Sequence, residues 1–463
     1  MPELKLAEIA AAVAGSVDRA YAGRPFRDFQ FDTRAMKANS LFFAMRTPKA
    51  DGHDHVRELA SLPGAGAVVR RDFAARGLKL PLVRVDDPLR AAQDLASHVR
   101  RKFRSVKYVG IAGSAGKTTT KEFIYQILSH KYRCFRSPQN WNNWIGLPFS
   151  LLQMSGREEA AVFELAMSDP GIGEIDRLAQ VLKPDVAVLL NVFPVHLEFL
   201  GTVANAARAK SEILGHLEAD GCAFVNGDQP LLRRLASVRR GQMIFFGCRR
   251  GPNQVVLRKV TREDGASRLC IDFFGIGEEF SAPLVSRTQV ENLFAAILVA
   301  QRLGMKNFEI QEAVSRLRPL AGRGQVRRLG KFTIIDETYN SNPEALKKTL
   351  RWVDDEYAGK KAAVLGDMLE LGKNELGFHR EVGRFFAGLH FDLLVTVGGR
   401  AEALAAAARK AGYPARRVRC CASAAEAGGC LRRELKGEAG VAVLFKGSRG
   451  MALEKAIAEL THG

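Results

Sequence analysis

Apolar residues along this chain gather in short continuous runs that alternate with helical sequence. The runs 160–163 and 186–192 are apolar at nearly every position, which predicts strands that are buried on both faces. The stretch 106–111 predicts a further strand, and 118–128 after it predicts a helix. Buried strands separated by helices predict an α/β fold in which parallel sheets are flanked by helices.

The same pattern divides the chain into parts. A short α/β segment fills residues 1–85, and the central part follows at 86–319. Within the central part, 255–260 and 268–274 predict an antiparallel pair of strands. The stretch 320–324 is predicted to be a linker to a C-terminal part at 320–463. The strands predicted in that last part are 332–335, 362–365, 393–397 and 441–445. We therefore predict three α/β domains, at 1–85, 86–319 and 320–463.

Composition is that of a globular protein of several domains, with 463 residues, 47% hydrophobic and 26% charged. No apolar run approaches the ~18 residues that a membrane helix needs. The start Met1–Lys5 lacks the layout of a signal peptide. We therefore expect a cytoplasmic protein without membrane insertion. The seven cysteines form no CxxC pair and are expected to be reduced.

The net charge of +19 favours anionic partners such as nucleotides and polyphosphates. Basic pairs such as Arg70-Arg71 and Arg249-Arg250 are scattered and have no aromatic residues interleaved with them. Binding of single-stranded nucleic acid usually needs such aromatic stacking surfaces. We therefore expect no nucleic-acid partner.

A glycine-rich segment follows the strand at 106–111 and precedes the helix at 118–128, which is the context of a phosphate-binding loop. Its backbone N–H groups are expected to surround phosphate oxygens. Lys117 would reach the β- and γ-phosphates, and the Thr118 hydroxyl would lie on Mg²⁺. The expected nucleotide-binding residues of the loop are Gly113, Ser114, Ala115, Gly116, Lys117, Thr118 and Thr119.

The stretch 202–217 is predicted to be a helix with one unusual position. Val203, Ala206 and Ile213 mark its apolar stripe, and Lys210 falls on the same stripe. Burial lowers the pKa of an amine, and a neutral amine can react with CO₂ to give a carbamate, an oxygen ligand of the kind that Mg²⁺ prefers. The alternative is a lysine that reaches solvent or pairs with Glu212.

Two further polar residues fall at the ends of predicted strands. Glu164 ends the strand at 160–163, and His196 follows the strand at 186–192. Ligands of open α/β sheets bind at the carboxyl ends of strands. Lys117, Glu164, His196 and the inward Lys210 therefore suggest a Mg-ATP site.

These segments resemble the Mur ligases, and the resemblance covers nearly the whole chain. In the central part it is carried by 113–119, Glu164, 191–198 and 207–212. Asp32-Thr33-Arg34 is similar to the D-S-R element of the family's UDP-binding domain. Residues 138–148 resemble its N-x-N-N-x-I-G-x-P segment. The resemblance implies an N-terminal UDP-binding domain, a central P-loop ATPase domain and a C-terminal Rossmann-like domain.

The C-terminal segments resemble one branch of that family. Residues 336–343 resemble D-D-x-Y-N-A-N-P, 364–372 resemble L-G-D-M-x-E-L-G, and 446–449 match K-G-S-R. These signatures belong to the members that add D-alanyl-D-alanine to UDP-N-acetylmuramoyl-tripeptide. The resemblance implies an ATP-dependent ligase of peptidoglycan precursor synthesis that forms an acyl phosphate. The sequence leaves the oligomeric state open, and a monomer is the default expectation.

The resemblance also implies roles for individual residues. Lys117, Glu164, His196 and Lys210 would be catalytic, with two Mg²⁺ ions held by Thr118, Glu164, His196 and carbamylated Lys210. The ATP contacts outside the phosphate loop would be Asn292, Arg323, Asp336 and Asn340. Contacts to the UDP-sugar substrate would come from Thr33, Arg34, Asn140, Asn142 and Asn143. The segment 286–292 departs from the family's G-x-H-N-x-x-N pattern, of which only Asn292 is kept.

Two other functions remain open at the level of sequence. The first is a different amino-acid ligase of the same superfamily, such as the one that adds the third residue of the peptide. The second is a nucleotide-binding protein that keeps this fold without catalysis. The intact set of Lys117, Glu164, His196 and Lys210 favours an enzyme.

Overall fold

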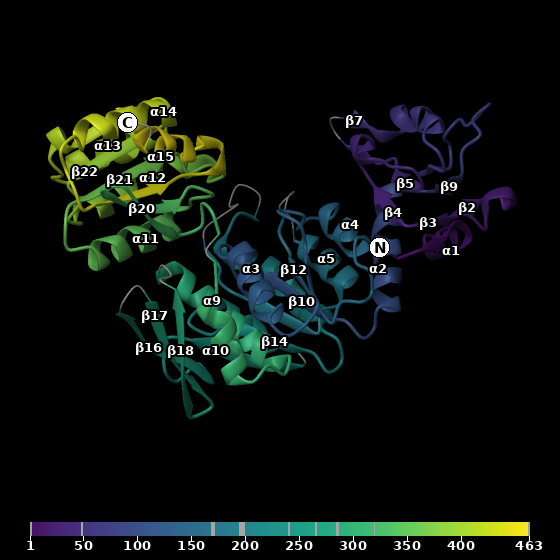
Figure 1. Ribbon diagram of the computed structural model, residues 1–463, viewed down its shortest axis with the longest axis horizontal. Coiled ribbons are helices and arrows are strands. Elements are labelled where there is room, and N and C mark those ends of the chain that lie inside the picture. Colours follow the sequence, from purple (N-terminus) through teal and green to yellow (C-terminus); the bar gives the residue numbers. More distant parts are fainter. Residues whose placement is uncertain are drawn as a thin grey trace.

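The computed structural model describes residues 2–47, 50–167, 172–193, 200–238, 241–263, 266–283, 287–318 and 320–461. Within these ranges, sheets of five, nine and six strands succeed one another along the chain. Figure 1 shows the three sheets with their helices as separate bodies, the central one between the other two. The predicted α/β class is therefore confirmed.

The N-terminal sheet has the strand order β2-β9-β8-β5-β4 and is parallel except for β2. Its strands are β2 (Ser16–Val17), β4 (Asp28–Gln30), β5 (Ser40–Phe43), β8 (Gly66–Arg70) and β9 (Leu82–Val85). The other elements of this part are β1 (Leu4–Lys5), α1 (Leu6–Ala12), η1 (Arg19–Tyr21), β3 (Pro25–Phe26), η2 (Thr33–Ala35), β6 (Arg46–Thr47), β7 (Ala50–Asp51) and η3 (Gly52–Ser61). The pairs β1–β3 and β6–β7 form small separate ribbons.

The central sheet has the order β11-β12-β10-β13-β14-β15-β16-β17-β18 and is parallel up to β16. Its strands are β10 (Lys107–Ala112), β11 (Cys134–Arg136), β12 (Ala160–Glu164), β13 (Val186–Leu189), β14 (Cys222–Asn226), β15 (Gln242–Gly247), β16 (Val255–Glu263), β17 (Ala266–Phe273) and β18 (Ile276–Pro283). The last three are antiparallel, which confirms the pair predicted at 255–260 and 268–274.

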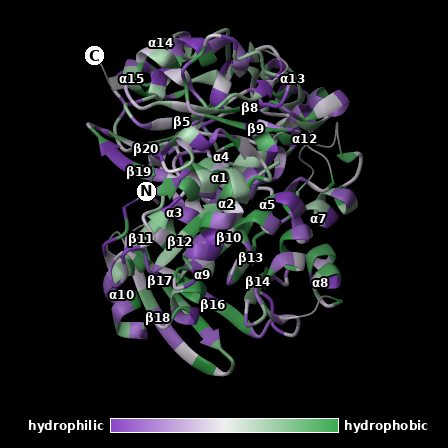
Figure 2. Cartoon of the chain, turned by 90° about the vertical axis from the view of Figure 1, so that its right-hand side faces the viewer, coloured by the Kyte–Doolittle hydropathy of each residue, from purple (hydrophilic) through white to green (hydrophobic). Residues whose placement is uncertain are grey.

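The helices of the central part cover this sheet. They are α2 (Pro88–Lys102), α3 (Lys117–Leu128), α4 (Gly146–Leu152), α5 (Glu174–Leu182), α7 (Val203–Ser211), η4 (Glu212–His216), α8 (Pro230–Ala236), α9 (Arg287–Arg302) and α10 (Asn307–Ser315). Alternate residues of β10 belong to different apolar clusters: Tyr108 and Ala112 pack in one, Val109 and Ile111 in the other. The strand is therefore buried on both faces, as its apolar run predicts. In Figure 2 the ribbon around β13 and β14 is largely hydrophobic.

Two predicted elements are shorter than expected. The strand at 186–192 ends at Leu189, and the helix at 202–217 is α-helical only over Val203–Ser211 before it tightens into η4. The Ser211 hydroxyl donates to the Ala207 carbonyl at 2.8 Å, a bond that competes with the helical ladder and bends helices. Gly215 follows within the same turn and weakens the α-helix further.

The C-terminal sheet has the order β19-β20-β24-β21-β22-β23, in which only the edge strand β19 is antiparallel. Its strands are β19 (Gln325–Leu329), β20 (Phe332–Glu337), β21 (Lys361–Gly366), β22 (Leu393–Val397), β23 (Val418–Cys421) and β24 (Val441–Lys446). Its helices are α11 (Pro343–Glu356), η5 (Gly372–Asn374), α12 (Glu375–Ala387), α13 (Ala401–Lys410), η6 (Ala415–Arg417), α14 (Ala424–Glu434), η7 (Arg449–Met451) and α15 (Glu454–Thr461). Each of the four strands predicted here is present.

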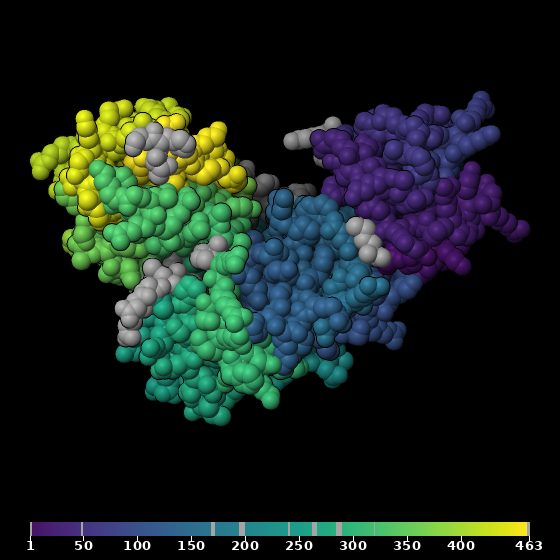
Figure 3. Space-filling model, viewed as in Figure 1, coloured from purple at the N-terminus to yellow at the C-terminus, as the bar shows by residue number. Residues whose placement is uncertain are grey.

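The three bodies enclose an open space. Figure 3 shows the N-terminal and C-terminal bodies on either side of the central one, with a wide hollow between them. Strands β10 and β12 of the central body and β20 and β24 of the C-terminal body end close to their common boundary, because residues at or after the ends of all four line one pocket. No helix in the described ranges is long and apolar enough to cross a membrane.

Candidate active site

The loop between β10 and α3 has the geometry of a phosphate-binding loop. Gly116, the residue before α3, has a left-handed backbone with φ of 84°. The amine of Lys117 donates to the Gly113 carbonyl at 2.8 Å, which folds the lysine back over the loop. Burial lowers the pKa of this amine. The N-terminus of α3 adds positive potential at the same place, so the loop suits an anionic ligand.

Asn191, which sequence analysis did not single out as a site residue, holds this loop from the neighbouring strand. Its side-chain oxygen accepts from the Ala115 N–H at 2.9 Å, and its amide nitrogen donates to the Ala115 carbonyl at 3.1 Å. Its own carbonyl accepts from the Ser114 N–H at 3.0 Å. Asn191 is the one polar residue in the run 186–192, and that interruption was the signal that could have revealed it.

A pocket of about 280 Å³ opens between this loop and the C-terminal body. Its walls come from the ends of β10, β12 and β20, from α9 and from the segment before β19. Of the residues predicted from the sequence, those that line it are Ser114, Ala115, Gly116, Lys117, Thr118, Thr119, Asn140, Asn142, Glu164, Asn292, Arg323 and Asn340. The structure therefore brings most of the predicted nucleotide and catalytic residues to one cavity.

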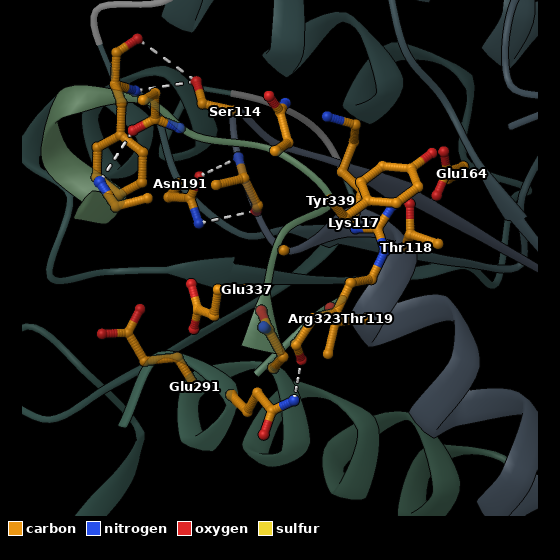
Figure 4. A pocket seen from close by; sticks show the side chains of 18 of the residues that line it. Ser114, Lys117, Thr118, Thr119, Glu164, Asn191, Glu291, Arg323, Glu337 and Tyr339 are labelled. Atoms are coloured by element: carbon orange, nitrogen blue, oxygen red, sulfur yellow. Dashed lines mark hydrogen bonds between the residues drawn. The ribbon is translucent and has the colours of Figure 1, made fainter. Parts of the chain in front are cut away.

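Glu164 lines this pocket, and one of its carboxylate oxygens has no hydrogen-bond partner among the described residues. Asn142 donates its side-chain N–H to Oε1, whereas Oε2 is buried and has no hydrogen-bond partner among the described residues. A buried carboxylate oxygen without a partner is costly, so the position favours a cation. Thr118 lines the same pocket, and Figure 4 labels both residues. This pair fits Mg²⁺, which prefers oxygen ligands.

Lys210 is buried on the apolar stripe of α7, as its spacing predicts. Only 3% of the residue is exposed, and Ala206, Ala207 and Ile213 around it belong to the core. Burial, reinforced by the charge of Lys117, lowers the pKa of Lys210 to about 7. The amine therefore neither reaches solvent nor keeps the ordinary basicity of a lysine.

The alternative partner of Lys210 is engaged elsewhere. The Glu212 carboxylate accepts from the backbone N–H groups of Gly173 and Asp176 at 2.7 and 2.9 Å. Among the described residues, no ion pair or hydrogen bond to Lys210 is present, nor is there a group of three His, Cys, Asp or Glu side chains that could hold a metal. A metal ion here would need the hydroxyl, carboxylate or carbamate oxygens named above.

The C-terminal body closes the pocket with stacked and paired side chains. The Arg323 guanidinium lies 3.6 Å from the centre of the Tyr339 ring, and burial lowers its pKa. The buried Lys446 donates to the Glu337 carboxylate at 2.7 Å and to the Asn340 carbonyl at 3.0 Å. Figure 4 shows Tyr339 over Arg323, with Glu337 farther along the cavity. Four further residues line the pocket that were quoted from the sequence only as parts of motifs and not as site residues: Gln289, Glu337, Tyr339 and Lys446.

Some predicted residues lie away from this pocket. The Asp336 carboxylate accepts from the Thr338 N–H and hydroxyl at 3.2 and 2.8 Å and is not part of the lining. The Asn143 side-chain oxygen accepts from the N–H groups of Ile145 and Gly146, at the start of α4. Gly113 and Lys210 are close to the pocket but outside its lining.

Thr33 and Arg34 belong to the N-terminal body, where Arg34 pairs with Asp32. His196 and the segment 284–286 lie outside the described residues.

Comparisons with known proteins agree with this geometry. Residues 111–300 match the family model of the Mur ligase middle domain, and residues 322–449 match that of the Mur ligase glutamate ligase domain. The UDP-N-acetylmuramoyl-tripeptide--D-alanyl-D-alanine ligase of Bacillus subtilis is 32% identical over 93% of this chain and 92% of its own length. The chain belongs to the Mur ligase family. The resemblance found in the sequence is thereby confirmed.

Comparison with solved structures shows which members of the family this Mur ligase resembles in fold. The crystal structure of MurF from Acinetobacter baumannii superposes with a TM-score of 0.90 at 26% identity, over 100% of both chains. MurF from Thermotoga maritima in complex with ADP gives 0.83 at 29% identity, over 94% of this chain and 97% of that one. A folylpolyglutamate synthase of Mycobacterium tuberculosis shares the fold alone, with a TM-score of 0.64 at 16% identity.

Gly116 offers a test of the phosphate loop of this Mur ligase. A Cβ at Gly116 would overlap the amide oxygen of Asn292, and the backbone there has positive φ. We expect Gly116→Ala to weaken ADP binding at least about tenfold, because the loop and Asn292 must separate to make room. Titration calorimetry with ADP measures this. Gly412→Ala is the control, since Gly412 has φ of 99° with open space around it. Equal ADP affinity in the Gly116 variant and the wild type would contradict the assignment.

Proposed function

We propose that this protein joins D-alanyl-D-alanine to the terminal carboxylate of UDP-N-acetylmuramoyl-tripeptide, with conversion of ATP to ADP and phosphate. The observation that carries the proposal is the closure of the phosphate-loop pocket by Tyr339, Asn340 and Lys446, which belong to the signatures of the D-alanyl-D-alanine-adding branch. The names of the relatives in Bacillus subtilis and Treponema pallidum, at 32% and 31% identity, support the same activity.

The reaction requires two anions to meet. The substrate carboxylate attacks the γ-phosphorus of ATP, ADP leaves, and an acyl phosphate forms. The amine of the dipeptide then attacks the acyl carbon, and phosphate leaves with the electron pair of the C–O bond. The protein's part is to position the reactants and to neutralise their charge. Lys117 and Arg323 are cations of the pocket that serve this role.

The metal ligands are proposed from the family resemblance. Thr118 and Glu164 would hold one Mg²⁺, and His196 with a carbamylated Lys210 would hold a second. When bound, these ions supply positive charge at the phosphate oxygens. The buried Oε2 of Glu164, which has no hydrogen-bond partner among the described residues, supports the first site. The low pKa of Lys210, about 7, supports carbamate formation, since the amine must be neutral to react with CO₂.

The remaining residues are proposed to bind substrates. Asn292, Arg323, Asp336 and Asn340, with the loop 113–119, would bind ATP, although Asp336 would have to exchange its bond to Thr338. The UDP-sugar would lie between the N-terminal and central bodies. Its proposed contacts are Thr33, Arg34, Asn140, Asn142 and Asn143.

The domain boundaries are proposed at 85/86 and 319/320. Strand β9 ends at Val85, and the sheet that begins with β19 shares no strand with the central one. We also propose that the enzyme is a monomer and works in the cytoplasm, where ATP and the UDP-linked precursor would be available. Size-exclusion chromatography with light scattering tests the first of these.

The activity is tested by phosphate release from ATP with UDP-N-acetylmuramoyl-tripeptide as acceptor. We expect release that requires D-alanyl-D-alanine and gives the pentapeptide product by mass spectrometry. Diaminopimelate with the dipeptide-stage precursor, and glutamate with a folate, are the competing substrate pairs. If the protein turns over only one of these competing pairs, the family assignment would stand and the proposed substrate would be wrong. Nucleotide binding without turnover on any pair would favour a non-catalytic protein.

A further inference from the structure

Lys121 is a buried lysine that takes no part in the reaction described above. It lies on α3, one turn after the phosphate loop, and none of its surface is exposed. Its amine donates to the carbonyls of Ser137 and Gln139 at 2.8 and 2.9 Å. Burial lowers the pKa of this amine to about 8. Burial of a lysine at this cost needs specific partners, which here are the carbonyls of Ser137 and Gln139 and, at 3.8 Å, the Glu122 carboxylate.

Glu122, the next residue of α3, also contacts this segment. The Glu122 carboxylate accepts from Arg136, the last residue of β11, and the Arg136 guanidinium lies 4.2 Å from the centre of the Tyr125 ring. The Ser137 N–H donates to the Val162 carbonyl of β12 at 3.0 Å. The segment 136–139 is therefore held between the helix of the phosphate loop and the strand that ends in Glu164.

Residues 140–143, which we call the asparagine loop, continue directly from this segment. Asn142 donates its side-chain N–H to Glu164 Oε1, and its carbonyl accepts from the Ala166 N–H at 2.8 Å. Asn140 and Asn142 line the pocket. The loop that donates to Glu164 Oε1 therefore follows a segment that rests on Lys121, and Oε2 of the same carboxylate is buried without a hydrogen-bond partner among the described residues.

We infer that Lys121 is a positioning residue, which joins the phosphate-loop helix to the asparagine loop and so holds Asn142 and the Glu164 carboxylate in place for the reaction. The inference rests on the proposed function. Methionine at position 121 would fill the same space, but the carbonyls of Ser137 and Gln139 would lose their donor. The segment would then shift, and Asn142 and Glu164 with it. The phosphate loop would keep its own bonds to Asn191.

The test separates nucleotide binding from turnover. In Lys121→Met we expect kcat to fall about 10–100-fold, since small displacements of reacting groups cost rates of this order. The dissociation constant of ADP should stay within about twofold, because the phosphate loop is held by Asn191 and not by the asparagine loop. Lys121→Arg keeps the charge and the donors and should recover most of kcat. Equal losses in ADP binding and in kcat, or no loss in either, would overturn the inference.

A double-mutant cycle with Asn142→Ala decides whether the two residues act together. Combined with Lys121→Met, the losses in kcat should be less than multiplicative, because both changes release the same carboxylate. Lys131→Met is the matched control. This lysine follows the end of α3 and also bridges to a carbonyl and a carboxylate, those of Gly304 and Glu309, outside the pocket. Any loss in kcat caused by Lys131→Met should multiply with the loss caused by Asn142→Ala, because the two residues are independent.

A second variant and a wild-type control keep the inference testable if Lys121→Met fails to fold or the wild type shows no turnover. If Lys121→Met does not fold, Lys121→Gln, which keeps a donor group, takes its place in the cycle. Multiplicative losses there would overturn the inference. Absence of turnover by the wild type with D-alanyl-D-alanine would instead overturn the proposed function. ADP binding by the wild type then shows that the protein is folded, so the two failures are distinguishable.

Discussion

Replacement of Lys210 by methionine is expected to lower kcat for phosphate release by roughly 10²–10³-fold, the loss seen when one electrostatic contact to a transition state is removed. Lys210 lies on the buried face of α7 with a pKa of about 7. At neutral pH a large part of its amine is therefore uncharged and can form a carbamate. Lys210→Arg keeps a positive charge but cannot form a carbamate. It should therefore be as inactive as the methionine variant.

The carbamate itself has a direct readout. Wild-type protein in ¹³C-bicarbonate should show a carbamate carbon signal by NMR that both variants lack. Lys183, which is exposed at the end of α5, offers a matched control: Lys183→Met should keep both the signal and kcat. Full activity in Lys210→Met would show that Lys210 is only a core residue.

Stability should move in the opposite direction to activity. In the folded chain without CO₂ or metal, the pKa of Lys210 is about 7, whereas its ordinary value is 10.5. Between these values the unfolded chain binds more protons, so the free energy of unfolding rises with pH. The cost of the buried amine is therefore greatest below pH 7. Lys210→Met should raise the free energy of unfolding by about 1–3 kcal/mol there, and the gain should fade toward pH 10.5. Urea unfolding at several pH values measures it.

Replacement of Lys117 by methionine is expected to lower kcat/KM for ATP by roughly 10³-fold, as for other cations that neutralise a phosphoryl group in its transition state. The amine of Lys117 now bonds the Gly113 carbonyl within the loop. On binding, it is expected to exchange that weak partner for phosphate oxygens. ADP affinity should fall less than kcat/KM, because the backbone N–H groups of the loop remain.

Lys107→Met is the control for this variant. Lys107 begins the same strand β10 at its far end and pairs there with Asp185 at 3.0 Å. Its removal should leave kcat/KM within about twofold, since surface ion pairs contribute little. Steady-state kinetics with varied ATP compare the two. Equal losses in both variants would indicate damage to the strand and not to phosphate contacts.

Patterns over a few neighbouring residues predicted the features of this enzyme that depend only on such residues. The apolar runs of β10 and β12 predict strands buried on both faces, and the glycines before Lys117 predict a loop that can surround phosphate. The spacing of Ala206, Lys210 and Ile213 placed a lysine on a buried stripe, where the structure also has it. Each of these inferences depends only on residues a few positions apart. The extent of the helix at 202–217 was wrong because Ser211 and Gly215 interrupt it.

Tertiary structure decided which residues meet. Thr120 and Asn292 are hydrogen-bonded across 172 positions, and Lys446 and Glu337 across 109. Nothing in the local sequence of either partner indicates such pairing. Asp336 illustrates the converse: its place at a strand end suggested a ligand contact, but the adjacent Thr338 occupies its carboxylate.

By itself, the sequence determined the α/β class, the phosphate loop, the buried position of Lys210 and the family resemblance, since periodicity and motif spacing encode burial and turns directly. Only the tertiary structure decided that Asn191 holds the phosphate loop, that Arg323 stacks on Tyr339 and that one oxygen of Glu164 has no hydrogen-bond partner among the described residues. The reason is physical: these contacts depend on where strands end relative to one another, and strand order is set by the packing of the whole sheet.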